Sequence, residues 1–187
     1  MAELTFAQAE RRSILLPALI AVAVIGAIAA LAFYYLPHHT ADLAVTHVAI
    51  LPEHTVFKSD SKLVGHVDPS EDDLYVLATV RVDNHLRDPL FLKDITATLT
   101  GADDSVATTS AIEERDLASL YTTFPALKPL ASAPLARESA IDPRGHGEGM
   151  VLLHFTIPQS TWDQRKDATI PLDFYHQGSL TVPIPKP

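Results

Sequence analysis

The hydrophobic positions of the chain follow two patterns, one long uninterrupted run near its start and short alternating runs after it. From residue 14 to residue 36 no side chain is charged, and about 20 apolar residues suffice for a helix to cross the core of a bilayer. Pro17 lies in the first turn, where its missing N–H is tolerated. Aromatic residues 33–35 stand at the far end, as is typical of a membrane interface. The pattern therefore predicts one transmembrane helix at 14–36.

Basic residues beside this run predict its orientation. Two arginines at positions 11 and 12 stand immediately before it, whereas the next basic residue is Lys58. Because cytoplasmic flanks carry an excess of Lys and Arg, we expect residues 1–13 in the cytoplasm, a single pass through the cytoplasmic (inner) membrane, and an extracytoplasmic, periplasmic remainder. A cleaved signal peptide is the alternative, since Ala-Leu-Ala at 30–32 resembles a cleavage site, although such apolar cores usually span only about 7–15 residues.

Beyond residue 42 the apolar residues mostly alternate with period two, which is the pattern of a strand with one buried face. The expected strands cover 44–51, 74–82, 91–100, 150–157, 168–175 and 179–184, with further candidates at 106–112 and 135–141. Residues 150–157 follow a glycine-rich turn at 142–149 and are apolar on both faces, which predicts a central strand. Pro183 and Pro185 mark the last strand as a sheet edge that cannot accept another strand.

Two helical stretches interrupt the strands. Leu117, Leu120, Tyr121 and Phe124 follow the helical i, i+3, i+4, i+7 spacing behind an acidic start at 113–114, and this predicts a short helical insert. A single helical turn is expected at 160–163. Short strands separated by turns predict an all-β fold, an immunoglobulin-like antiparallel β-sandwich at 43–187. A linker at 37–42 would join it to the transmembrane helix.

Two sequence patterns carry a resemblance to known families. The first is a strand ending Val-Arg-Val-Asp-Asn at 80–84, then a loop to Pro89-Leu90 and a strand with Asp94-Ile95. It resembles small envelope β-sandwiches of the late-embryogenesis-abundant, water-stress type. The second, Ile-Asp-Pro-Arg-Gly at 141–145 before Gly-Met-Val-Leu-Leu-His-Phe at 149–155, is similar to membrane-anchored immunoglobulin-like bacterial domains of unknown function.

These resemblances cover roughly residues 42–185. They imply an immunoglobulin-like fold located outside the cytoplasmic membrane. They bring no catalytic residues to this sequence, and the helical insert at 113–124 departs from the simplest versions of either family.

Composition and charge narrow the classes of function. The 187 residues include no cysteine and carry a formal net charge of -9. Without cysteine there are no disulfides, zinc–thiolate sites or thiol nucleophiles, and the acidic balance argues against a nucleic-acid partner. The charges within 1–13 sum to zero, so the negative charge belongs to the outer domain. We therefore expect no electrostatic attraction of that domain to an anionic membrane surface.

Catalytic and metal-binding motifs are missing from the sequence. None of the nine histidines has the H-E-x-x-H spacing of a zinc site, and the acidic runs at 70–73 and 103–104 do not match a calcium-binding loop. There is also no G-x-S-x-G nucleophile turn. We therefore expect no enzymatic activity and no cofactor. His146, within the glycine-rich turn, is the candidate ligand contact.

The sequence favours an interaction role. We expect a membrane-anchored extracytoplasmic domain that serves as an accessory or structural module, bound to the bilayer through 14–36 and to a protein partner in the envelope. The candidate partner surface is Tyr121, Phe124 and Pro125, because binding residues often lie on segments that interrupt a rigid scaffold. The alternative is an envelope sensor domain for a metal or small ligand, with His146 and the acidic turns as contacts.

Overall fold

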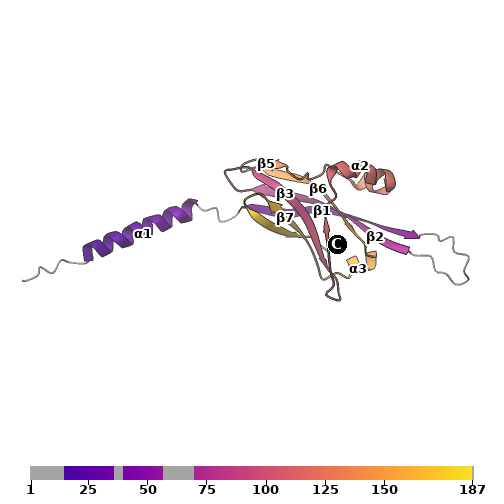
Figure 1. Ribbon diagram of the computed structural model, residues 1–187, viewed down its shortest axis with the longest axis horizontal. Coiled ribbons are helices and arrows are strands. Elements are labelled where there is room, and N and C mark those ends of the chain that lie inside the picture. Colours follow the sequence, from indigo (N-terminus) through magenta and orange to yellow (C-terminus); the bar gives the residue numbers. More distant parts are fainter. Residues whose placement is uncertain (1–14, 36–39, 57–69, 187) are drawn as a thin grey trace, which may run out of the picture. The chain divides into compact units, whose positions relative to one another are not determined.

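The computed structural model describes residues 15–35, 40–56 and 70–186 (Figure 1). The chain forms two compact units that divide between residues 38 and 39. The segment 1–13, half of the expected linker at 37–42 (residues 37–39) and the final proline lie outside the described residues. The folded unit begins with a strand at Ala41, two residues before the expected boundary.

The first unit contains the apolar helix α1 (Leu15–Tyr35). At about 1.5 Å rise per residue this helix is about 30 Å long, which is close to the thickness of a bilayer core. Its part from Leu15 to Tyr34 has a mean hydropathy of 2.7, and none of it is buried inside the protein. Length and composition suit a membrane-spanning helix, and a signal sequence near an N-terminus can meet the same criterion.

The second unit consists mainly of two antiparallel sheets. One has the order β1-β2-β6, formed by Ala41–Val56, Ser70–Asn84 and His146–Phe155. The other has the order β4-β3-β7-β8, formed by Val106–Ser110, Leu90–Thr100, Asp167–Phe174 and Gly178–Pro183, and β5 (Ala140–Ile141) pairs with the far end of β3. The alternating pattern therefore predicted the main strands of the fold.

The main core lies between the two sheets. In β2, the alternate residues Leu74, Val76, Ala78, Val80 and Val82 are completely buried, as period-two alternation predicted. They belong to one hydrophobic cluster with side chains from the other sheet, including Leu92 and Ile95 of β3 and Ile170 and Leu172 of β7. Burial of these facing rows provides the largest apolar contribution to the stability of the unit.

A second, smaller core covers part of the outer face of the three-stranded sheet. Tyr75 and Leu77 of β2 point away from the main core and pack with Leu117 of α2 (Glu114–Thr123) and Leu127 of η1 (Pro125–Leu130). The acidic first turn of α2 suits a helix N-terminus. The predicted helical insert is confirmed, and its apolar side lies on the sheet.

The structure corrects the predicted position of one strand. β6 is apolar on both faces, but the central strand of its sheet is β2. The second apolar face of β6 packs against the insert. Backbone hydrogen bonds occupy part of its outer edge: the Ile112 N–H donates to Leu152 O at 2.8 Å, and the Met150 N–H donates to Ala133 O at 2.8 Å.

Two further predictions need new boundaries. Within the candidate strand at 135–141, only Ala140–Ile141 is a strand. The residues before it run beside β6, where one isolated bridge joins Pro134 to Met150. The expected turn at 142–149 is shorter, since β6 already begins at His146. The single helical turn is confirmed as α3 (Gln159–Asp163).

The last strand ends at a sheet edge, as its prolines predicted. β8 pairs only with β7 among the described strands, and the Ile184 N–H donates to Ala168 O at 2.7 Å. Because successive backbone groups alternate in direction along a strand, the nitrogens of Pro183 and Pro185 face away from β7. That free edge therefore lacks two N–H groups that a further strand would need.

Candidate functional site

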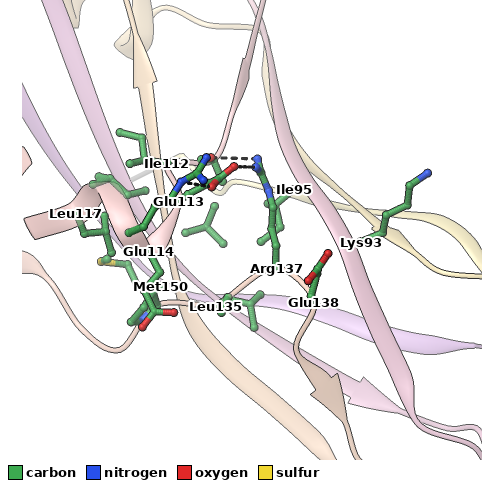
Figure 2. Close-up of a pocket in the computed structure, with 16 residues that line it drawn as sticks. Lys93, Ile95, Ile112, Glu113, Glu114, Leu117, Leu135, Arg137, Glu138 and Met150 are labelled. Atoms are coloured by element: carbon green, nitrogen blue, oxygen red, sulfur yellow. Dashed lines mark hydrogen bonds and ion pairs between the residues drawn. The ribbon is translucent and has the colours of Figure 1, made fainter.

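A cleft of about 720 Å³ opens between β3 of one sheet and β6 of the other, beside the segment that follows β4 (Figure 2). Its apolar lining comes from Ile95, Ala111, Ile112, Leu117, Pro134, Leu135, Ala136, Met150, Val151 and Leu152. Its charged lining comes from Lys93, Glu113, Glu114, Arg115, Arg137 and Glu138. We call this site the β4–β6 cleft. Its volume lies within the range of about 300–1,000 Å³ that is usual for ligand sites.

Arg137 holds three parts of this cleft together. Its Nη1 donates to the Glu113 carboxylate at 2.8 Å, and its Nη2 donates to the backbone oxygen of Ala111 at 3.1 Å. Its Nε lies 3.0 Å from Asp94 Oδ1, as an ion pair without hydrogen-bond alignment. One guanidinium therefore joins the segment before β5 to β3 and to the start of α2, as the sticks in Figure 2 show for Glu113.

A second guanidinium lies on the other side of the Glu113 carboxylate. Arg115 Nε lies 2.8 Å from the second carboxylate oxygen of Glu113, so this carboxylate stands between two arginines. Isolated exposed ion pairs contribute little to stability, whereas networks with defined geometry contribute more. Only about a quarter of the Arg137 side chain is exposed (27%). These contacts fix Arg137 and Glu113 at the cleft.

A glycine allows the wall of the cleft to form. The connector, residues 131–139, runs beside β6, and the Leu135 N–H donates to Met150 O at 2.9 Å. A Cβ placed on Gly149 would lie 2.6 Å from the backbone nitrogen of Leu135, closer than real side chains approach a backbone. Gly149 is therefore the residue that lets the connector lie this close to β6.

The partner surface predicted from sequence lies elsewhere on the insert. Tyr121 and Phe124 are half-buried, and the Phe124 ring packs against Tyr75 with their centres 5.0 Å apart. Burial of the Tyr121 side chain raises the pKa of its hydroxyl. Pro125 is exposed and begins η1. None of these three residues lines the β4–β6 cleft, to which the insert contributes only its first turns.

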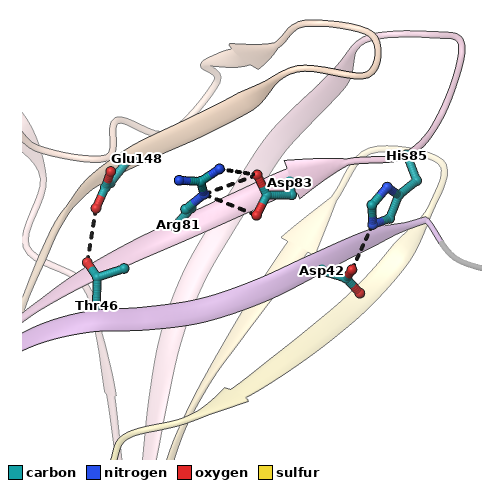
Figure 3. Close-up of polar contacts among 6 residues, drawn as sticks. All are labelled: Asp42, Thr46, Arg81, Asp83, His85 and Glu148. Carbon is teal, nitrogen blue, oxygen red and sulfur yellow. Dashed lines mark hydrogen bonds and ion pairs between the residues drawn. The ribbon is translucent and has the colours of Figure 1, made fainter.

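The predicted ligand contact, His146, is exposed at the start of β6 and lies opposite Asp83 of β2. Asp83 is itself held by Arg81, whose Nη2 donates at 2.9 Å (Figure 3). That hydrogen bond lowers the pKa of the Asp83 carboxyl below its ordinary value. In the described residues there is no group of three or more His, Cys, Asp or Glu side chains placed to hold a metal ion.

The two acidic runs use their carboxylates in contacts within the protein. The run at 70–73 was expected in a turn but forms the start of β2, paired with the end of β1. There Asp73 shares a 2.6 Å hydrogen bond with His154 Nε2, and Asp72 one of 2.7 Å with His54 Nδ1. In the turn at 103–104, Asp103 accepts from the Ser105 hydroxyl at 2.6 Å. The structure thus does not bring the two runs and His146 together as one ligand set.

Sequence reasoning did not identify the residues of the β4–β6 cleft. Lys93, Glu113, Arg137 and Met150 come from different elements, and no spacing in the sequence connects them. The only available signal was an arginine isolated in a segment rich in alanine and proline, at position 137.

Comparisons with known proteins add no functional assignment. No protein-family model matches the sequence, and no curated protein matches it. Among solved structures, a functionally unknown protein from Listeria monocytogenes EGD-e is 10% identical, with 78% of this chain and 88% of that one covered and a TM-score of 0.37. The structural-genomics target SoR45 is 7% identical, with 74% and 82% covered and a TM-score of 0.33. Neither likeness bears on the function of this chain.

Proposed function

We propose that this protein is a membrane-anchored interaction module that holds a protein partner in the β4–β6 cleft. The observation that carries the proposal is the cleft itself, which combines a volume suited to a ligand with charged side chains of both signs, two of which, Arg137 and Glu113, are held by their mutual ion pair. A binding surface on a rigid scaffold is a common arrangement for recognition. In this role α1 spans the cytoplasmic membrane once, and the folded unit is an extracytoplasmic, immunoglobulin-like β-sandwich.

The charges around the cleft favour a peptide segment as the occupant. Lys93, Arg115 and Arg137 face an equal number of acidic residues, Glu113, Glu114 and Glu138, so the charged lining has no net charge. A site for a small anion or cation would instead concentrate one sign of charge. Mixed charge above an apolar lining suits an extended segment that presents polar backbone groups and apolar side chains.

The α2–η1 insert supports the same role. Its first turn lines the cleft, while its Leu117 and Leu127 are buried against the sheet. The insert is thereby a fixed wall of the cleft. Tyr121, Phe124 and Pro125 remain a second candidate contact, on the side of the insert away from its first turn.

An envelope sensor for a small ligand is the alternative function. The volume of the cleft would also accommodate a small molecule. The two functions differ in what remains bound to the purified protein, because a partner chain persists through gentle purification at near-equal amount whereas a small ligand does not appear as a polypeptide.

The test is purification of the full chain from native membranes in a gentle detergent, with cross-linking and identification of attached chains. The cleft variant carries Lys93→Glu together with Glu138→Lys, two exposed positions, so that its net charge is unchanged. The matched control carries Lys128→Glu together with Asp88→Lys, also exposed and also neutral in sum, but outside the cleft.

Loss of the partner from the cleft variant alone supports the proposal. Retention of the partner by both variants places its contact outside the cleft, and a variant of Tyr121 and Pro125 would then be compared. Purification of the chain without a partner would favour the small-ligand function.

A further inference from the structure

Arg165 is a buried arginine without an acidic partner. Only 1% of the residue is exposed, and none of the carboxylates in the described parts of the chain lies within ion-pair distance of it. Its Nη1 donates to Trp162 O at 2.8 Å and its Nη2 to Pro185 O at 2.9 Å, while its buried Nε has no hydrogen-bond partner. A guanidinium stays charged in proteins, so burying it against carbonyls alone is unfavourable.

The same arginine lines a second pocket, at the opposite edge of the two sheets from the β4–β6 cleft. This pocket has a volume of about 290 Å³ and lies between β1 and the segment that follows β8. Its lining residues are Val45, Thr46, His47, Val48, Ile50, Trp162, Arg165, Pro185 and Lys186. We call it the Arg165 pocket. It contains two permanently cationic residues and a histidine, but no aspartate or glutamate.

Apart from Thr46, whose hydroxyl donates to the Glu148 carboxylate at 3.0 Å, the rest of the lining is apolar. The indole of Trp162 lies beneath the guanidinium, 4.0 Å from its carbon to the ring centre, and this cation–π contact holds the arginine in place. Three aliphatic side chains of β1 complete the apolar wall. A small site with a cationic end and an apolar body matches a small amphipathic anion.

From this geometry we propose that the Arg165 pocket binds a small organic monocarboxylate with a short apolar tail. The carboxylate would lie beside the exposed Lys186 and close to the Arg165 guanidinium, whose positive charge would attract it. The tail would lie on the aliphatic side chains of β1, next to Trp162. A dianion such as phosphate would gain less, because the apolar wall offers it no hydrogen bonds.

The electrostatics of Arg165 agree with this proposal. Burial lowers the pKa of its guanidinium, and the nearby Asp163 and Asp167 offset only part of this effect from outside ion-pair distance. A bound carboxylate would supply the missing negative charge directly, whereas the two aspartates act across a longer separation.

Trp162 provides the readout, because it is the only tryptophan of the chain and lines the pocket. The full chain in a non-ionic detergent is titrated with hexanoate, with its neutral analogue hexanamide, and with acetate, which keeps the charge but has almost no tail. We expect hexanoate to bind at least about tenfold more tightly than either, as the loss of a charged hydrogen bond or of the apolar tail would produce.

Variants test which charges are responsible. Lys186→Ala, at an exposed position, should weaken hexanoate binding a few-fold, whereas Lys128→Ala, which removes the same charge outside the pocket, should leave it unchanged. Arg165→Gln should abolish the preference for hexanoate over hexanamide. Since that substitution removes contacts to two carbonyls and could unfold the chain, the wild-type comparison of ligands stands as an independent test.

Equal affinity of the wild-type chain for hexanoate and hexanamide would overturn the proposal. Equal affinity for hexanoate and acetate would show an adventitious ion only, and would also overturn it. An equal loss in the Lys186 and Lys128 variants would do the same, since the effect would then follow the overall charge of the protein.

Discussion

Asn84, at the end of β2, connects three separate segments of the folded unit, and its removal is the most informative stability test. The residue is 2% exposed. Its Nδ2 donates to the carbonyl oxygens of Asp88 (3.0 Å), Ile141 (3.2 Å) and Asp142 (3.0 Å). Its Oδ1 accepts from the Leu86 N–H at 2.8 Å. The variant Asn84→Ala removes all four contacts at once.

The expected loss of stability follows from the burial of the groups left behind. The contacts with Ile141 and Leu86 are buried, so each abandoned backbone group costs about 1–3 kcal/mol. The contacts with Asp88 and Asp142 are only partly buried, and water can replace them at little net cost. We therefore expect Asn84→Ala to lower the free energy of unfolding by about 3–5 kcal/mol.

The assay is urea unfolding of the full chain, followed by the emission of Trp162. Arg87→Ala, an exposed change in the same loop, serves as the control and should stay within about 0.5 kcal/mol of wild type. Asn84→Asp keeps the shape and the acceptor but removes the donors, so it should also destabilise the protein. A loss below about 1 kcal/mol for Asn84→Ala would refute the reasoning, because four native hydrogen bonds would then be nearly neutral.

Three further predictions concern other parts of the folded unit. Leu127→Ala should lower the free energy of unfolding by about 2–4 kcal/mol, because Leu127 is fully buried where the insert meets the sheet. It should also speed hydrogen exchange in α2 and η1. The control Leu130→Ala, at a 38% exposed position, should change both quantities far less. The hydrogen bond from Arg81 makes the pKa of Asp83 lower in the folded state than in the unfolded state. The ionised carboxyl therefore stabilises the folded state at pH values above its unfolded pKa. That stabilisation is lost as the pH falls through the lower folded pKa. Asp83→Asn should therefore flatten the fall in stability below about pH 4, measured as urea midpoints from pH 2 to 5; an unchanged slope would contradict this. Gly149→Ala would force the connector away from β6 and should destabilise by about 1–3 kcal/mol, with increased protease cleavage confined to the connector as the local measure.

The buried row of β2 was predictable because alternate residues from Leu74 to Val82 are all apolar, and they pack against the opposite sheet. The other face of β2 is covered by the insert at Tyr75 and Leu77. The hydrophobic pattern placed β6 wrongly at the centre of its sheet, since an apolar second face can result from a covering helix as well as from a central position. The extension of β1 through Pro52 and Glu53 had no such signal, and it forms because β2 pairs with it there.

The candidate sites depend on tertiary contacts that a sequence does not display. Arg137 lines the cleft only because the connector brings it to Glu113 and Asp94. Arg165 follows Trp162 by three residues, a spacing that places both on one side of a helical turn, yet burial of the pair requires Pro185 from the far end of the chain. Neither arginine could be told from a solvated surface residue beforehand.

The position of β1 has a mechanical consequence. The backbone oxygen of Thr40 accepts from the His85 N–H at 3.1 Å, and the ladder of β1 with β2 begins directly after it at Ala41 and Asn84. Tension applied to the chain at residue 40 therefore enters the longest strand pairing among the described strands. When β1 is pulled along its axis, the rungs of this ladder share the load, and when it is pulled sideways, they open one by one from Asn84. Force applied at residue 40 thus passes directly into a paired strand.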